Sequence, residues 1–156
     1  MIFKAIIKFK ILQNIILTLF FILIVSFPSF SQTTEKLVEQ CAAKLGNAQY
    51  LRDFQVELEA TGTDGETQVA KYSLVLSSNT QYRLMICNAD DSQGNGLLEL
   101  YDGRGLMGSN YSESTDKLYQ SFDVQIRKTD VYHIFISFKD GEPGRAVAIL
   151  AFVKRL

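Results

Sequence analysis

The feature that most constrains this chain is an alternation of apolar and polar residues that starts near Phe54 and continues almost to the end. Its clearest stretch contains Tyr132, Ile134, Ile136 and Phe138. Successive side chains of a β-strand point to opposite faces, so alternation with period two indicates a strand with one buried face. Eight segments show this pattern: residues 54–60, 72–76, 82–86, 98–100, 106–109, 122–126, 132–138 and 147–153.

Turn residues separate these short segments at intervals of about 8 to 12 positions, which is typical of an antiparallel β-sandwich. Asp64-Gly65 and Asp102-Gly103 each predict a hairpin turn, because Asp-Gly is a favoured hairpin loop. No second helical segment is available as the crossover of a parallel sheet. Since eight strands in two sheets are the jelly-roll number, the sequence predicts an all-β jelly-roll sandwich.

One short amphipathic helix is predicted ahead of the strands, over about residues 34–46. Thr34 is the expected N-cap and Gly46 the expected stop. The apolar residues between them recur at the spacing of a single helical stripe: Leu37, Val38, Cys41, Ala42 and Leu45. We expect this stripe to pack on the sandwich.

The N-terminal segment has the order of a secretory signal peptide. Lysines precede an uncharged apolar block at 15–27, and small residues, Ser29 and Ser31, stand at the −3 and −1 positions of a cleavage site. The alternative is an uncleaved membrane anchor, but a spanning helix needs roughly 20 apolar residues. We predict a signal peptide over 1–31 and one domain over 32–156. That domain would be periplasmic or secreted, with no membrane attachment after cleavage.

The predicted exported domain is mildly acidic. Of the 16 Lys and Arg residues, three precede the cleavage site, so 13 remain against 17 Asp and Glu, a net charge of −4. The sequence has no run of like charges and no basic patch with interleaved aromatic residues. Because nucleic-acid binding depends on neutralising phosphates, this composition excludes nucleic acid as a partner.

Cys41 and Cys87 are the two cysteines of the chain. Disulfides persist in oxidising compartments, so an exported pair predicts a bridge. The strand register supports it: if Leu84 and Ile86 face the core, Met85 and Cys87 face outward and need cover. The helix stripe could supply that cover and bring Cys41 to Cys87. Two buried free thiols are the alternative.

Four segments between residues 71 and 153 carry a family resemblance. They are Tyr72-Ser73-Leu74, Tyr82-Arg83-Leu84, Leu98-Glu99-Leu100-Tyr101-Asp102 and Asp130-Val131-Tyr132-His133-Ile134. With them the chain resembles the bacterial pre-peptidase C-terminal domain family. The resemblance implies a small exported jelly-roll β-sandwich without catalysis of its own, and it supplies no functional residues. Family members usually follow a secreted peptidase, whereas a helix and an additional strand precede the matching stretch here.

The inventory of catalytic residues is short. His133 is the single histidine, so a zinc site with several histidines is excluded. It stands inside a predicted strand, where we expect a partly exposed strand residue and not a catalytic base. The sequence has neither a nucleophile elbow nor a phosphate-binding glycine motif. It therefore predicts no enzyme and no cofactor, and a pair of carboxylates that hydrolyses glycans is the alternative.

The polar loop from Asn88 to Gly96 is the one candidate metal site. Asn88, Asp90, Asp91 and Asn95 offer the oxygen ligands that calcium prefers, although the EF-hand spacing is missing. The same residue types are common in ordinary loops. Calcium binding is one interpretation of this loop, and a plain solvated loop is the other.

Three tyrosines flank the loops, Tyr101, Tyr111 and Tyr119, and could stack on sugars or be ordinary rim residues. Asn110-Tyr111-Ser112 matches an N-glycosylation acceptor, which the bacterial resemblance makes a chance match. We expect a non-catalytic exported binding or accessory module of the cell envelope or secretome that meets a protein or a glycan through its loops. The alternatives are a small carboxylate-based glycan hydrolase and a structural subunit of an envelope assembly.

Overall fold

The computed structural model describes the backbone of residues 30–62 and 65–156, and side chains from residue 34 onward except 63–64. Apart from its last two positions, the predicted signal peptide lies outside the described residues. Thr33–Leu156 forms one compact unit. Within the described part of the chain, no helix combines the length and the apolar character needed to cross a membrane.

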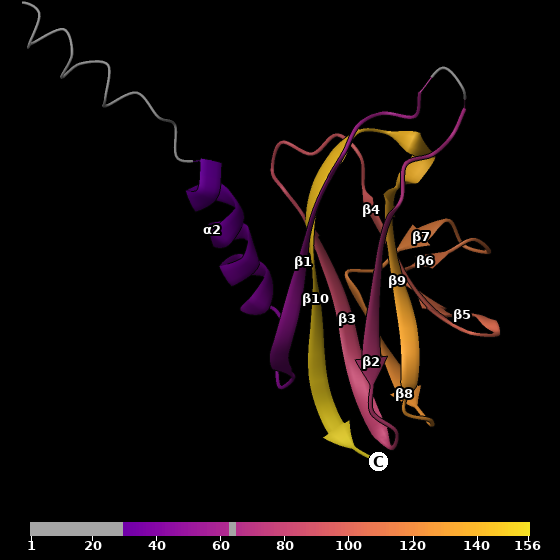
Figure 1. Ribbon diagram of the computed structural model, residues 1–156. Helices are drawn as coiled ribbons and strands as arrows, with labels where there is room; N and C mark the ends of the chain where they lie inside the picture. Colours follow the sequence, from indigo (N-terminus) through magenta and orange to yellow (C-terminus); the bar gives the residue numbers. More distant parts are fainter. Residues whose placement is uncertain (1–29, 63–64) are drawn as a thin grey trace, which may run out of the picture. The chain divides into compact units, whose positions relative to one another are not determined.

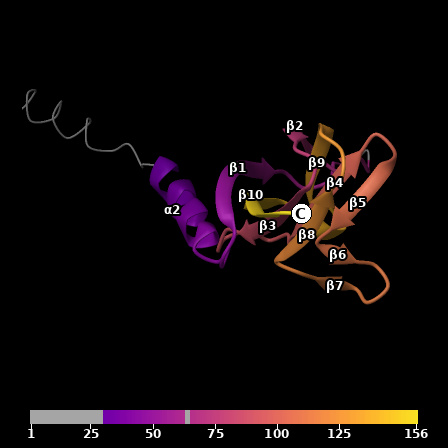
Figure 2. The same cartoon turned by 90° about the horizontal axis from the view of Figure 1, so that it is seen from below.

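Two four-stranded antiparallel sheets face each other, as Figures 1 and 2 show. The first sheet has the order β1 (Gln49–Leu58), β10 (Gly144–Arg155), β3 (Thr80–Asn88) and β8 (Ser121–Ile126). The second has the order β2 (Ala70–Leu76), β9 (Asp130–Phe138), β4 (Gly96–Asp102) and β5 (Gly105–Ser109). Two short strands, β6 (Tyr111–Ser112) and β7 (Lys117–Leu118), form a separate hairpin, and a 3-10 turn, η1 (Lys139–Gly141), follows β9.

The connections confirm the predicted jelly roll. When the eight longer strands are numbered along the chain, the first sheet reads 1-8-3-6 and the second 2-7-4-5. This order is what two interlocked Greek keys produce. The eight predicted segments correspond to these strands, and the β6–β7 hairpin is an addition that is too short to produce an alternating pattern.

One predicted hairpin is wrong and one is right. Asp64-Gly65 lies between β1 and β2, which belong to different sheets, because β1 pairs with β10 and β2 with β9. Gly65 has a left-handed φ of 77°, and the chain passes from the first sheet to the second between β1 and β2. Asp102-Gly103 joins β4 and β5, which pair as an antiparallel hairpin.

The core between the sheets is built from the inward residues of both. Leu84 and Ile86 of β3 lie in it together with Leu98 of β4 and Ile134 of β9. Strand β10 is buried on both faces, since a run of six buried residues begins at Ala146. Every second residue of this run lies in the core between the sheets. The residues between them belong to a second cluster on the outer face of the first sheet.

Helix α2 (Phe30–Ala42) covers that outer face (Figure 2). The predicted register is confirmed, because the helix stripe and the outward residues of β3 and β10 share one buried cluster: Cys41, Leu45, Met85, Cys87, Val147, Ile149 and Ala151. The first sheet therefore lies between the helix on one side and the second sheet on the other.

Both ends of the helix lie about four residues before the predicted ones. Thr34 is not the N-cap, since the helix already begins at Phe30. Residues 30–34 contain no Pro or Gly, either of which would have made the helix begin later in the chain. The helix ends at Ala42, four residues before the predicted stop at Gly46, and turns continue to Gly46, whose φ of 66° is left-handed.

Candidate functional site

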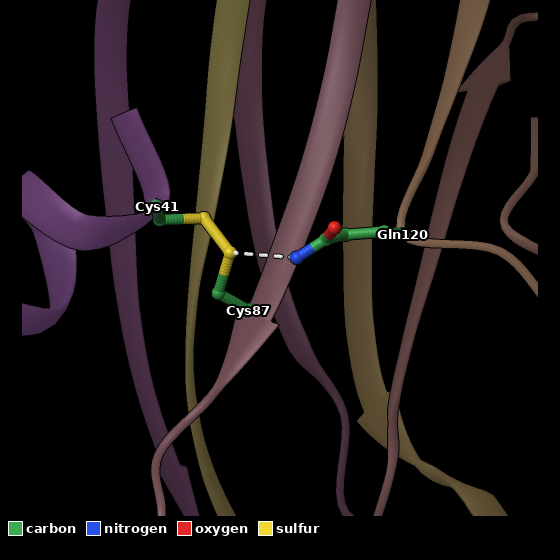
Figure 3. Close-up of a disulfide and its surroundings, with 3 residues drawn as sticks. All are labelled: Cys41, Cys87 and Gln120. Atoms are coloured by element: carbon green, nitrogen blue, oxygen red, sulfur yellow. Dashed lines mark hydrogen bonds between the residues drawn. A yellow bond between two sulfur atoms is a disulfide. The ribbon is translucent and has the colours of Figure 1, made fainter. Parts of the chain in front are cut away.

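The structure joins Cys41 of α2 to Cys87 of β3 in a disulfide (Figure 3). The two Sγ atoms are 2.07 Å apart and the Cα atoms 5.9 Å. Both cysteines are buried, and the side-chain Nε2 of Gln120 donates a hydrogen bond of 3.5 Å to the Sγ of Cys87. The disulfide fixes the helix to the first sheet and lies at one wall of a pocket.

That pocket has a volume of about 250 Å³ and lies where the ends of β3 and β4 meet the segment after β7. We call it the amide pocket, because amide side chains predominate among its polar lining residues: Lys44, Asn88, Asn95, Asn110, Tyr119 and Gln120. Cys87 also lines it, so the disulfide lies at its wall. Loop, strand and helix-end residues that are far apart in the sequence meet here.

Asn110 has a structural role at the floor of the amide pocket. It is 1% exposed, and its Oδ1 accepts a hydrogen bond of 2.7 Å from the backbone N–H of Leu98. Its Nδ2 donates to the carbonyls of Gly96 and Tyr119 at 3.0 and 3.2 Å. A buried amide with both ends engaged cannot accept a glycan, which supports the view that the glycosylation motif is a chance match.

The four predicted calcium ligands divide between two places. Asn88 and Asn95 come together in the amide pocket, where Asn88 Nδ2 donates to Asn95 Oδ1 at 3.3 Å. Asp90 and Asp91 instead line a different pocket of about 270 Å³ beside α2. No group of three or more His, Cys, Asp or Glu side chains that could hold a metal occurs among the described residues. Calcium binding stays a prediction.

Asp91 already has a cationic partner. Its two carboxylate oxygens each accept a hydrogen bond of 2.7 Å from Nη2 of Arg145. These hydrogen bonds hold the pKa of Asp91 below its ordinary value. A calcium ion that used this carboxylate would have to displace the guanidinium group.

Of the three tyrosines that could stack on sugars, only Tyr119 lines the amide pocket. Its side chain is 48% exposed, with the Nζ of Lys117 5.2 Å from its ring centroid. Tyr111 donates instead to Asp116, and Tyr101 packs on Phe135 with ring centroids 4.8 Å apart. Tyr119 is therefore the tyrosine that a bound ligand would meet.

His133 is half-buried on the outward side of β9, as the sequence predicted for a strand residue. Its Nδ1 lies 2.8 Å from Oγ of Ser73, its cross-strand neighbour on β2. Sequence reasoning missed Ser73, which only the strand register could have revealed. Within the described residues no carboxylate hydrogen-bonds to His133, so the pair lacks the third group of a catalytic triad.

Four carboxyl groups among the described residues have a shifted pKa. The side chains whose pKa is shifted, Asp91, Asp116, Asp123 and Asp130, all have it lowered, chiefly by hydrogen bonds from Arg or Lys. A carboxylic acid that protonates a leaving group needs a raised pKa. None of these four carboxyl groups therefore has the raised pKa of a general acid.

Two solved structures have a distant likeness to this chain. No family model matches it, and no curated protein does. A periplasmic inhibitor of g-type lysozyme from Aeromonas hydrophila aligns with a TM-score of 0.49 at 10% identity, over 67% of this chain and 87% of that one. The pre-peptidase C-terminal domain of a Bacillus anthracis collagenase aligns with a TM-score of 0.44 at 13% identity, over 64% and 87%. Neither likeness identifies a ligand.

Proposed function

We propose that the chain is a non-catalytic exported module that binds a sugar residue of a glycan in the amide pocket. The observation that carries this proposal is the exposed ring of Tyr119 beside a cluster of side-chain amides at the loop end of the sandwich. Function on loops held by a rigid scaffold is the usual arrangement in sandwiches of this kind.

The chemistry of the lining suits hydroxyl groups. A side-chain amide both donates and accepts hydrogen bonds, and a sugar hydroxyl needs both kinds of partner. Within the described part of the chain, the Nδ2 of Asn95 and the Oε1 of Gln120 have no protein partner, so they can face a ligand. The ring of Tyr119 offers an apolar surface for the C–H groups of the sugar.

Positive charge at the pocket favours an acidic sugar. Lys44 lines it and forms no ion pair with any described residue, and Lys117 stands over the Tyr119 ring. A carboxylate on the sugar would gain attraction from both ammonium groups. We therefore expect uronic acids or carboxylate-bearing amino sugars to bind more tightly than neutral ones.

The absence of carboxylates from the pocket lining supports binding over hydrolysis. Glycoside hydrolysis ordinarily uses two carboxyl groups about 5 to 10 Å apart on either side of the bond. No Asp or Glu is among the described residues that line the amide pocket. Export rests on the predicted signal peptide and is supported by the disulfide, since such bonds persist in oxidising compartments.

Calorimetric titration with glycan fragments tests the proposal. Oligomers of N-acetylglucosamine and of uronic acids are added to the purified protein, to Tyr119→Ala and to Asn95→Ala. We expect binding of at least one class, weakened about tenfold by either substitution, which is about 1.4 kcal/mol. Tyr50→Ala is the matched control, because Tyr50 is 41% exposed and does not line the pocket.

Two results would contradict the proposal. One is the absence of binding across the panel, and the other is binding that neither pocket substitution changes. Turnover of a fragment that a single Asp→Asn substitution abolishes would favour the hydrolase alternative instead.

A further inference from the structure

The outer face of the second sheet has no element packed on it within the described part of the chain, whereas α2 covers the outer face of the first. We call this outer surface the open face. It is formed by the outward residues of β2, β9, β4 and β5: Lys71, Ser73, Val75, Leu97, Glu99, Tyr101, Leu106, Val131, His133, Phe135 and Ser137.

The open face exposes apolar side chains in adjacent positions. Val75 and Val131 are direct cross-strand partners and are 65% and 47% exposed. Leu106 is 53% exposed beside Tyr101, its partner on β4. The rings of Tyr101 and Phe135 pack against each other at 4.8 Å and extend the apolar surface across β4 and β9. The polar pair Ser73–His133 lies between the two valines and Phe135, so the open face mixes exposed apolar and polar side chains, as interaction sites do.

Two opposite charges stand symmetrically on this surface. In the register of the sheet, Lys71 on β2 and Glu99 on β4 lie directly on either side of Phe135 on β9. The Nζ of Lys71 lies 5.0 Å from the Phe135 ring centroid. Neither charge forms an ion pair with any described residue of the same chain. The Oε2 of Glu99 accepts a hydrogen bond of 3.2 Å from the Tyr101 hydroxyl, but neither charge is neutralised by an opposite charge, so each can form an ion pair with a partner.

We propose that the open face binds a second copy of this chain in a two-fold symmetric dimer. A rotation of 180° about an axis that runs along β9 above Phe135 exchanges the β2 side with the β4 side. It therefore places Lys71 of each copy over Glu99 of the partner subunit, so the two ion pairs form together. A two-fold axis perpendicular to the strands, above Phe135, would instead place Lys71 of one copy over Lys71 of the partner subunit, and the two like charges would repel each other.

The size of the open face fits a weak dimer. Strands lie about 4.8 Å apart and rise about 3.3 Å per residue, so four strands present a surface of roughly 15 by 20 Å. Two such surfaces would bury about 600 Å² in total, which is below the roughly 1,000 Å² of a stable specific interface and in the range of weak, transient contacts. We therefore expect a dimer that dissociates on dilution. Face-to-face packing of two sheets at about −30° is a common arrangement and needs no change of strand geometry.

Charge exchange between Lys71 and Glu99 tests both the interface and its symmetry. Sedimentation velocity is measured from micromolar to near-millimolar concentration for the purified exported protein and for its variants. Lys71→Glu alone and Glu99→Lys alone each face a like charge across the axis, and we expect each to weaken dimerisation at least tenfold. The double variant restores opposite charges, and dimerisation should return. Glu57→Lys on β1, away from the open face, is the control and should leave it unchanged.

A wild-type chain that stays monomeric throughout the concentration range would overturn the proposal. So would a double variant that dimerises no better than the single variants while melting at the wild-type temperature. Val131→Asp gives a second check at an exposed position, because a charge there should abolish the dimer without disturbing the core. None of the residues of the open face lines the amide pocket, so glycan binding and dimerisation can fail independently.

Discussion

At the scale of single residues, Arg83 and Asp123 form the ion pair with the best geometry. Arg83 Nε lies 2.7 Å from Asp123 Oδ1, and Nη2 lies 3.0 Å from Oδ2. Arg83 Nη1 also donates to the carbonyl of Leu45 at 3.1 Å, which ties the segment after α2 to β3. These hydrogen bonds hold the pKa of Asp123 below its ordinary value.

We predict that Asp123→Asn lowers the free energy of unfolding at neutral pH by at most about 1 kcal/mol, because the pair is partly exposed and solvent screens it. A carboxyl whose folded pKa is lowered stabilises the fold above its unfolded pKa, about 3.9, and this contribution is lost as the pH falls through the folded pKa. Urea unfolding of both proteins from pH 7 to pH 3 checks this, with Glu57→Gln as control. A difference in the free energy of unfolding between the wild-type protein and Asp123→Asn that grows toward acid pH would contradict the prediction.

The acidic loop is a second question at this scale. Calcium at roughly 100 times its dissociation constant would add about 2.7 kcal/mol of stability, worth several degrees of melting temperature. Because Arg145 already holds Asp91, we expect the same melting temperature in millimolar calcium and in chelator. The opposite result is a melting temperature that is higher in calcium than in chelator, with the difference lost in the double variant Asp90→Asn, Asp91→Asn. It would establish the loop as a calcium site.

At the scale of elements, the disulfide fastens α2 to the first sheet. It closes a loop with a sequence separation of 46 residues. The chain-entropy model gives about 4 kcal/mol for a loop of that size. We predict that Cys41→Ser with Cys87→Ser lowers the free energy of unfolding by about this amount and reduces the hydrogen-exchange protection of α2. Two alkylatable thiols in the wild-type protein, isolated without reductant, would show that the bond is not formed.

Gly141 fixes the turn between β9 and β10. Its φ of 69° is left-handed, and an added Cβ would overlap the Thr61 Oγ1. The Thr61 N–H donates to the Gly141 carbonyl at 2.8 Å, so the two segments cannot easily separate. We predict that Gly141→Ala costs at least about 1 kcal/mol of stability. Gly103→Ala is the matched control, since its Cβ would meet no heavy atom within 4 Å. Equal melting temperatures for the two variants would contradict this account.

At the scale of the whole molecule, alternation predicted the jelly roll because every long strand buries one face against the other sheet. The register of Met85 and Cys87 likewise predicted the position of the helix. Asp64-Gly65 could not reveal that β1 and β2 belong to different sheets. Turn residues specify a bend in the chain but not which strands pair with each other. The amide pocket was only partly predictable. Asn88, Asn95 and Tyr119 stood out, but Lys44 and Gln120 belong to no local motif and meet them only through tertiary packing.

Sugar binding in the amide pocket is the central claim, and backbone amide chemical shifts during a glycan titration test it most directly. With ¹⁵N-labelled protein and uronic-acid oligomers as the probe, we predict saturable shifts centred on Asn88, Asn95, Tyr119 and Gln120, which line the pocket. The same titration of Tyr119→Ala should need at least about tenfold more ligand, equivalent to about 1.4 kcal/mol. Spectra that do not change with any glycan class, or shifts that centre on the open face and spare the pocket, would contradict the claim.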